Sequence, residues 1–204
     1  MLIFKVGRKI QIMSFRYLQL RTVINQWLEL EKKQWKDLKS IFTIMEYSEN
    51  EHIVLPGENF FQLFFVNKGL FRLYYLDQKG KEFNKSFICE NMFGGPVAFS
   101  ILDIPLYYGM HTLEETSLLV ANYNEFNALY DSHPIFDRLG RKLAEWLLIK
   151  KELRERSFLI EDAKERFLDF AKNYPGLLKR IPQYHIASYL GISEVSLSRL
   201  KNNI

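Results

Sequence analysis

The C-terminal end of the chain gathers short polar and basic side chains at helical spacing. Those expected to face outward from a short helix are Ser193, Glu194, Val195, Ser196, Ser198, Arg199, Lys201 and Asn202. Arginine can pair with the edge of guanine and asparagine with that of adenine, while serine and lysine bind phosphate. These residue types therefore predict contacts with the major groove of double-stranded DNA.

The residues just before them predict the tight turn that would position such a helix. Pro182 lies near the start of a first helix, and the small Ala187 allows a second helix to approach closely. Gly191 can take the backbone conformation of a tight turn, and Ser193 can cap the second helix. An ordinary helical hairpin uses similar residues, but the Ala-x-x-x-Gly-Ile-Ser spacing favours a helix-turn-helix.

A long amphipathic helix is predicted from Pro134 to Ile160. Its residues that recur at steps of three and four, and that we expect at a dimer interface, are Phe136, Leu139, Leu143, Trp146, Lys150 and Leu153. Such a seam is typical of a dimer helix, in which the polar Lys150 would set the register. The alternative is an amphipathic helix that packs on its own domain.

Between Tyr47 and Asn122 the pattern changes to short β-type runs separated by turn residues. The expected strands are Glu51–Leu55, Phe60–Asn67, Leu70–Leu76, Glu82–Cys89, Tyr107–Leu113 and Ser117–Asn122. Many short strands with regular turns suggest a barrel or a jelly roll. Residues 16–45, which precede them, are expected to be helical with a break near Leu30.

Composition limits the class of protein. The chain has 204 residues, 48% of them hydrophobic, and a net charge of +4, which is compatible with a nucleic-acid partner. Its one cysteine, Cys89, permits no intramolecular disulfide and favours the cytoplasm. We expect no metal or cofactor, no membrane span, no signal peptide and no enzyme activity, because no ligand spacing or catalytic motif is present. Met13 is an alternative start to Met1.

Several stretches carry a resemblance to a known family. They are Ile53–Glu58, Phe64–Leu70, Tyr74–Glu82, Phe136–Arg141 and Arg180–Ser193. In this order they resemble the CRP/FNR family of transcription regulators, in the version found in Bacteroidetes-type members. The resemblance implies a cyclic-nucleotide-binding-like sensor domain, a dimer helix and a helix-turn-helix. It also implies a homodimer that binds DNA and a small-molecule effector, with RNA polymerase as a further partner.

The chain departs from the family pattern where cyclic AMP would bind. The resemblance places the effector pocket at Gly94, Gly95, Phe99, Tyr107, Tyr108 and Gly109. The family's ribose-binding glutamate is replaced by Gly95 or Pro96, and its phosphate-binding arginine by Tyr108. We therefore expect no tight cyclic AMP binding. Because the sequence ends at Ile204, we also expect a helix-turn-helix without a full β-hairpin wing.

These observations combine into one expected architecture. We predict an α+β chain with an N-terminal extension (1–20), a β-barrel or jelly-roll sensor domain (21–130), a dimerisation helix (131–160) and an all-α helix-turn-helix domain (161–204). The expected function is that of a DNA-binding regulator. The alternative is a small-ligand-binding module that has lost DNA binding.

Overall fold

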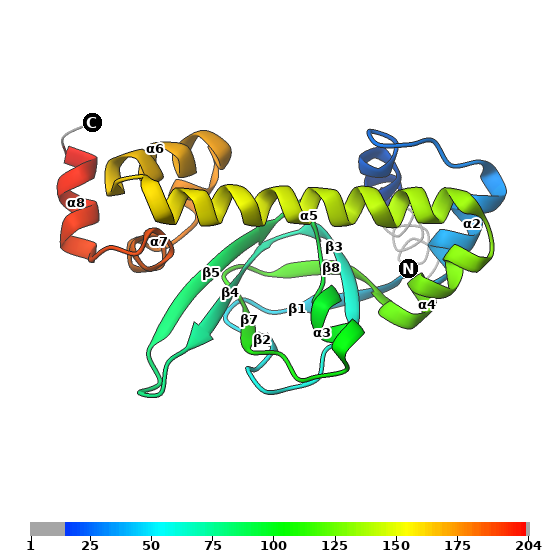
Figure 1. The fold of residues 1–204 in the computed structure, drawn as a ribbon, viewed down its shortest axis with the longest axis horizontal. Helices are drawn as coiled ribbons and strands as arrows, with labels where there is room; N and C mark the ends of the chain where they lie inside the picture. Colours follow the sequence, from blue (N-terminus) through cyan, green and yellow to red (C-terminus); the bar gives the residue numbers. More distant parts are fainter. Residues whose placement is uncertain (1–14, 203–204) are drawn as a thin grey trace, which may run out of the picture.

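The structure is a computed structural model that describes residues 15–202 (Figure 1). After a first helix at residues 15–24, the elements are α2 (Lys32–Ser40), β1 (Thr43–Tyr47), β2 (His52–Val54), β3 (Gln62–Lys68), β4 (Leu70–Leu76), β5 (Glu82–Cys89), β6 (Phe93–Gly94), α3 (Val97–Leu102), β7 (Tyr108–Thr112), β8 (Thr116–Asn122), α4 (Tyr123–Ala128), a 3-10 turn (Leu129–Asp131), α5 (Pro134–Ile160), α6 (Ala163–Asn173), a second 3-10 turn (Leu177–Lys179), α7 (Gln183–Leu190) and α8 (Glu194–Asn202).

The strands form two antiparallel sheets, which correct the expectation of a closed barrel. One sheet has the order β1-β8-β3-β6 and the other the order β2-β7-β4-β5. Apolar side chains from both sheets, such as Phe64, Phe71 and Leu118, are buried in one core cluster. Because each sheet covers the apolar face of the other, the core closes without a continuous ring of strands. We call residues 43–122 the β domain.

The N-terminal segment contains the expected break, but its helical part ends earlier than predicted. The helix at residues 15–24 ends before an irregular stretch, and α2 is followed by β1, which starts at Thr43. The helical prediction to residue 45 is therefore wrong at its end, because β1 pairs with β8 and Thr43 lies opposite Val120. Leu20, inside the expected N-terminal extension, is fully buried in a core shared with α5.

Helix α5 has the predicted bounds and connects the two ends of the molecule. His133 caps its first turn by accepting a hydrogen bond from the backbone N–H of Ile135, and Pro134 occupies the first turn. Figure 1 shows α5 passing over the β domain, with α2 and α4 at one end and α6, α7 and α8 at the other. The prediction of one long helix is confirmed.

The C-terminal helices pack together and against the β domain. Phe167 and Phe170 of α6, Ile186 and Leu190 of α7 and Leu197 of α8 are buried in one cluster. The same cluster contains Leu70 of β4 and Phe87 of β5, whose ring lies edge-on to Phe170 with centroids 6.1 Å apart. The C-terminal helices are therefore seated on the sheet edge at β5.

Candidate nucleic-acid interface and effector site

Helices α7 and α8 form a compact pair around a left-handed glycine. Gly191 has a φ of 70°, and the following Ile192 N–H donates to Ala187 O at 3.1 Å. Ser193 Oγ accepts from Ser196 N–H at 3.1 Å, which caps α8. Leu190 and Leu197 are fully buried between the helices. We call α7 and α8 together the C-terminal helix pair.

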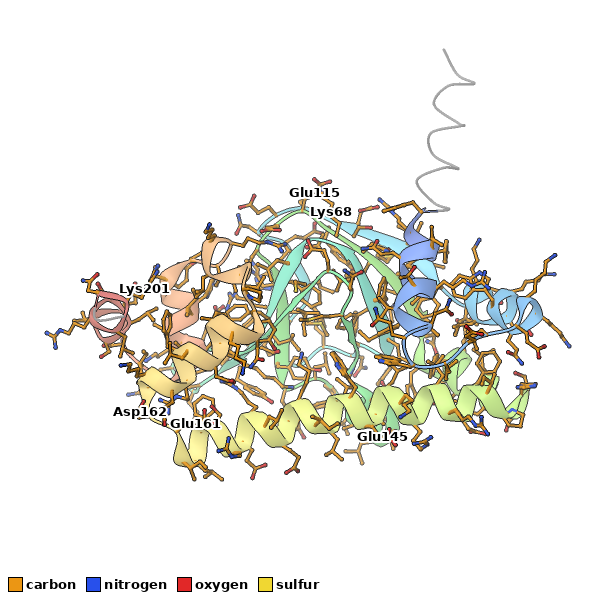
Figure 2. All side chains as sticks on the ribbon, turned by 90° about the horizontal axis from the view of Figure 1, so that it is seen from above. Lys68, Glu115, Glu145, Glu161, Asp162 and Lys201 are labelled. Carbon is orange, nitrogen blue, oxygen red and sulfur yellow. The ribbon has the colours of Figure 1, made fainter. Side chains whose placement is uncertain are left out.

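The predicted DNA-binding residues all lie on the exposed side of this pair. They are Ser193, Glu194, Val195, Ser196, Ser198, Arg199, Lys201 and Asn202. A surface hollow between the start of α7 and α8 is lined by Gln183 together with Glu194, Val195, Ser198, Lys201 and Asn202. Figure 2 shows Lys201 on α8 at the end of the molecule, away from the sheets. Among residues 15–202, no carboxylate pairs with Arg199 or Lys201.

A polar contact fixes α7 against β5. The Asn84 side-chain amide lies 3.0 Å from His185 Nδ1 and donates to His185 O at 3.0 Å. The backbone N–H of Asn84 donates to Ser188 Oγ at 3.0 Å, and Arg72 donates to Asn84 Oδ1 at 3.1 Å. Burial, followed by the nearby Arg72 charge, lowers the pKa of His185 to about 4. The imidazole is therefore neutral at pH 7. Its Nδ1 can accept a hydrogen bond from the Asn84 amide, and the ring carries no charge that would repel Arg72.

Arg180, just before α7, binds two carboxylates of the β domain. Its Nε and Nη2 donate to Glu114 at 2.8 and 2.6 Å, and its Nη1 and Nη2 donate to Glu90 at 2.9 Å each. Hydrogen bonds from Arg180 lower the pKa of Glu90 although burial alone would raise it. Glu90 also accepts from Gly69 N–H at 2.9 Å, so the fork is tied to the turn between β3 and β4. Charge-assisted bidentate pairs of this kind fix orientation as well as adding energy.

The C-terminal part of α5 holds the other end of α7. Arg154 donates to Tyr189 O and its guanidinium lies 3.6 Å from the Tyr189 ring centroid. Arg166 of α6 donates through Nε to Leu190 O at 3.0 Å. Both arginines satisfy carbonyl groups that the last turn of a helix leaves free. The C-terminal part of α5 and α6 thus contact the C-terminal helix pair directly.

The expected effector residues come together around α3 and the start of β7. The Phe99 ring lies edge-on to Tyr107 and to Tyr108, with centroids 5.2 and 5.6 Å away. Tyr107 is exposed, whereas Tyr108 is buried. The glycines have a packing role, because a Cβ on Gly94 would meet the Phe64 ring and one on Gly109 would meet the Tyr74 ring.

A groove borders this region between α3 and α5. Its volume is about 500 Å³, and its lining includes Gly94, Val97 and Ile101 on one side and Leu147, Leu148 and Lys151 on the other. We call it the α3/α5 groove. Gly95 has a φ of 155°, and a Cβ there would come within 2.5 Å of Leu63, so the chain at the groove's edge requires glycine.

The six residues expected at a dimer interface fall into two groups. Phe136 and Leu139 are each 1% exposed in the core of their own chain, which differs from the expected place at an interface. Leu143 and Trp146 also pack against that core, and Lys150 lies 4.7 Å above the Trp146 ring. Only Leu153 is largely exposed, and it neighbours Leu148 and Ile149, which are equally exposed. The periodicity of the seam reflects packing within the chain as well as an outward apolar face.

Several residues at these sites were not singled out from the sequence. Arg180, Glu90 and Glu114 lie far apart in the chain, and the two carboxylates are in turns, where acidic residues are common. Lys85 is another: it is the extra residue where the register shifts from Leu73–Ser86 to Tyr74–Asn84. The sequence feature that could have drawn attention to Lys85 is that no other Lys or Arg occurs between residues 82 and 137.

Two features are missing from the part of the chain that the structure describes. No helix within residues 15–202 is long and apolar enough to cross a membrane. The same residues contain no group of three or more His, Cys, Asp or Glu side chains arranged to hold a metal ion.

Comparison with known proteins agrees with the fold. Residues 44–133 match the family described as the cyclic nucleotide-binding domain. Among curated proteins, none matches the sequence.

Several solved structures share most of the architecture. FixK2 from Bradyrhizobium japonicum is 17% identical, covers 80% of this chain and 84% of its own, and has a TM-score of 0.67. A CooA mutant from Carboxydothermus hydrogenoformans is 19% identical over 81% of this chain and 77% of its own, with a TM-score of 0.64. The c-di-GMP responsive global regulator CLP from Xanthomonas campestris is 15% identical over 82% and 88%, with a TM-score of 0.63.

At identities of 15–19%, these neighbours show the fold. Residues 44–133 are therefore similar to the cyclic nucleotide-binding domain, and the chain shares its fold with these solved structures.

Proposed function

We propose that the protein is a DNA-binding transcription regulator of the CRP/FNR type. The observation that carries the proposal is the contrast between the two sides of the C-terminal helix pair. Its inner side is fixed by Asn84, Arg180 and Arg154, while the polar and basic side of α8 stays exposed and free of ion pairs within residues 15–202. A rigidly held helix with a free Arg199 suits readout of a DNA groove.

The proposed signal passes from the β domain to α8 through α5. The β domain binds Arg180, just before the C-terminal helix pair, through Glu90 and Glu114, and α5 contacts the pair through Arg154. An effector that binds one position of α5 more tightly than another would shift the position of α8 by that difference in affinity. The effector is not held as cyclic AMP is in the family, because Tyr108 replaces the phosphate-binding arginine.

The proposed active form is a homodimer in the cytoplasm that is formed through α5. Leu148, Ile149 and Leu153 give the helix an exposed apolar stripe, which water disfavours and a second α5 would cover. A two-fold pair of α8 helices would meet half-sites one DNA turn apart, roughly 34 Å. RNA polymerase is a further proposed partner at promoters.

Selection from a random DNA library tests this proposal. Purified protein is expected to enrich a palindromic sequence, and the bound fraction is expected to fall steeply between two salt concentrations, because Lys and Arg displace counterions from phosphate. Recovery of a non-palindromic half-site would contradict the dimer. No enrichment, with or without a small-metabolite mixture, would favour a ligand-binding module without DNA function.

A further inference from the structure

Lys85 is placed in an unusual position on β5. At the shift in register between β4 and β5, Leu73 lies opposite Ser86 and Tyr74 lies opposite Asn84, which leaves Lys85 without a partner across the strands. A bulge of this kind redirects a side chain and is common beside binding sites. Here it places Lys85 Nζ 3.7 Å from the ring centroid of Tyr108 and 5.4 Å from that of Tyr75.

The Lys85 ammonium has no acceptor within the described chain. It makes none of the side-chain hydrogen bonds found in residues 15–202, and no carboxylate there lies within 4.0 Å. An ammonium carries three N–H donors, and a ring face satisfies the charge only weakly. Burial, and then repulsion by Lys151 of α5, lower the pKa of Lys85 to about 8. The charge of Lys151 thus acts on Lys85, and no carboxylate within residues 15–202 pairs with either lysine.

The surroundings indicate what kind of molecule would supply that counter-charge. Lys151 also lines one end of the α3/α5 groove, whose walls between α3 and α5 are mostly apolar, including Val97, Ile101 and Leu147. Like Lys85, Lys151 forms no ion pair within residues 15–202. A groove of about 500 Å³ is within the usual range for small-molecule sites. An unpaired Lys151 at one end and mostly apolar walls, with the other lining cation, Arg141, already paired with Glu145, complement an amphipathic molecule.

We propose that Lys85 and Lys151 bind the anionic group of an organic anion whose apolar body lies in the α3/α5 groove. The anion would supply the counter-charge that no carboxylate within residues 15–202 supplies, and it would connect β5 with α5. The positive charge thus comes from Lys85 in the bulge of β5 and from Lys151 of α5. It does not come from position 108, where Tyr108 replaces the family's phosphate-binding arginine. The role of this anion as the effector rests on the proposed function. Its binding at this site does not depend on that function.

Lysine labelling read by mass spectrometry tests the site without DNA. At pH 8 the free amine of Lys85 reacts with an acylating reagent, and Lys79, which is exposed at the tip of the β4–β5 hairpin, serves as the control lysine. The probes are 2-naphthoate, the uncharged 2-naphthamide and inorganic phosphate. Pairing with an anion raises a lysine pKa by about one unit or more, so at pH 8 2-naphthoate is expected to slow labelling of Lys85 at least about fivefold and that of Lys79 little.

Each outcome decides the proposal. Protection by 2-naphthoate at lower concentration than by phosphate, with none by 2-naphthamide, is the expected result. Equal protection by the amide, or no selective protection of Lys85 by either anion, would overturn it. Protection that needs no probe and grows with protein concentration would assign the counter-charge to a second copy of the chain, and would overturn it as well.

A variant provides the second measurement. In Lys85→Met, the thermal stabilisation by 2-naphthoate is expected to disappear, while Lys79→Met keeps it. Stabilisation that survives in Lys85→Met would overturn the role of Lys85. Because neither readout uses DNA, a chain that binds the anion but no DNA would refute the proposed function and leave this site intact.

Discussion

The Arg180→Met substitution tests how the C-terminal helix pair is held on the β domain. It removes four charge-assisted hydrogen bonds and leaves Glu90 and Glu114 facing each other without a counter-charge. The side chains of Arg180, Glu90 and Glu114 are 30%, 31% and 35% exposed. An exposed ion pair contributes about 0–1 kcal/mol, and breaking a fully buried one costs about 3–5 kcal/mol. For this intermediate burial we expect a loss of about 2 kcal/mol.

Thermal and urea unfolding measure this loss. For a chain of this size each kcal/mol lowers the midpoint by about 2–4 °C, so Arg180→Met should unfold roughly 4–8 °C below the wild type. The matched control is Lys179→Met, which alters an exposed neighbour and should be neutral. Because the pKa of Glu90 is lowered in the fold, its contribution is present above its unfolded pKa and is lost as pH falls through the folded pKa. The wild type and Arg180→Met should therefore converge in acid.

A result equal to that of Lys179→Met would refute this reasoning. It would mean that the contacts of Arg180 contribute nothing beyond what water offers the separated side chains, and that apolar packing alone seats the helix pair. A Glu114→Gln variant completes a double-mutant cycle with Arg180→Met, in which a coupling energy near zero would lead to the same conclusion.

Three further predictions concern single sites. Gly191→Val should destabilise the chain by about 1–2 kcal/mol, because Gly191 is left-handed and its Cβ would lie 3.0 Å from Phe158; in urea unfolding, Gly191→Asn should lose less, and equal losses would contradict the role of backbone conformation. The pKa of His185 falls from 6.5 to about 4 on folding, so stability should be complete above pH 6.5 and decline by up to about 3 kcal/mol as pH falls to 4; His185→Gln should flatten that part of the pH profile, and an unchanged profile would place the titration elsewhere. Leu153→Glu should weaken dimerisation at least about tenfold by burying charge in the proposed interface; sedimentation equilibrium checks this, and an unaltered association would move the interface away from Leu153.

Much of the architecture could be predicted from the sequence because it is encoded locally. The long helix follows from a three- and four-residue apolar period that starts at Pro134, and the structure has the same bounds. The turn at Gly191 follows from one residue that tolerates a positive φ. All six expected strands overlap strands that pair in the described sheets, although Glu51–Leu55 is shortened to β2.

What could not be predicted depends on contacts between distant residues. Thr43–Tyr47 continues the apolar pattern of the preceding helix, and only pairing with β8 makes it a strand. An apolar seam on α5 does not say which partner covers it, and here Phe136 and Leu139 face their own core. The fork from Arg180 joins segments separated by up to 90 residues, a relation that no local pattern contains.

The central claim, that α8 reads DNA, is tested most directly by the affinity of the protein for its selected duplex and for a scrambled duplex between 50 and 200 mM salt (about the range in which counterion release is steep). Log affinity is expected to fall linearly with log salt. The Arg199→Ala substitution is expected to cost about 1–3 kcal/mol of binding free energy on the selected duplex and less on the scrambled one. The claim would be contradicted if the affinity for both duplexes changed neither with salt concentration nor on Arg199→Ala substitution.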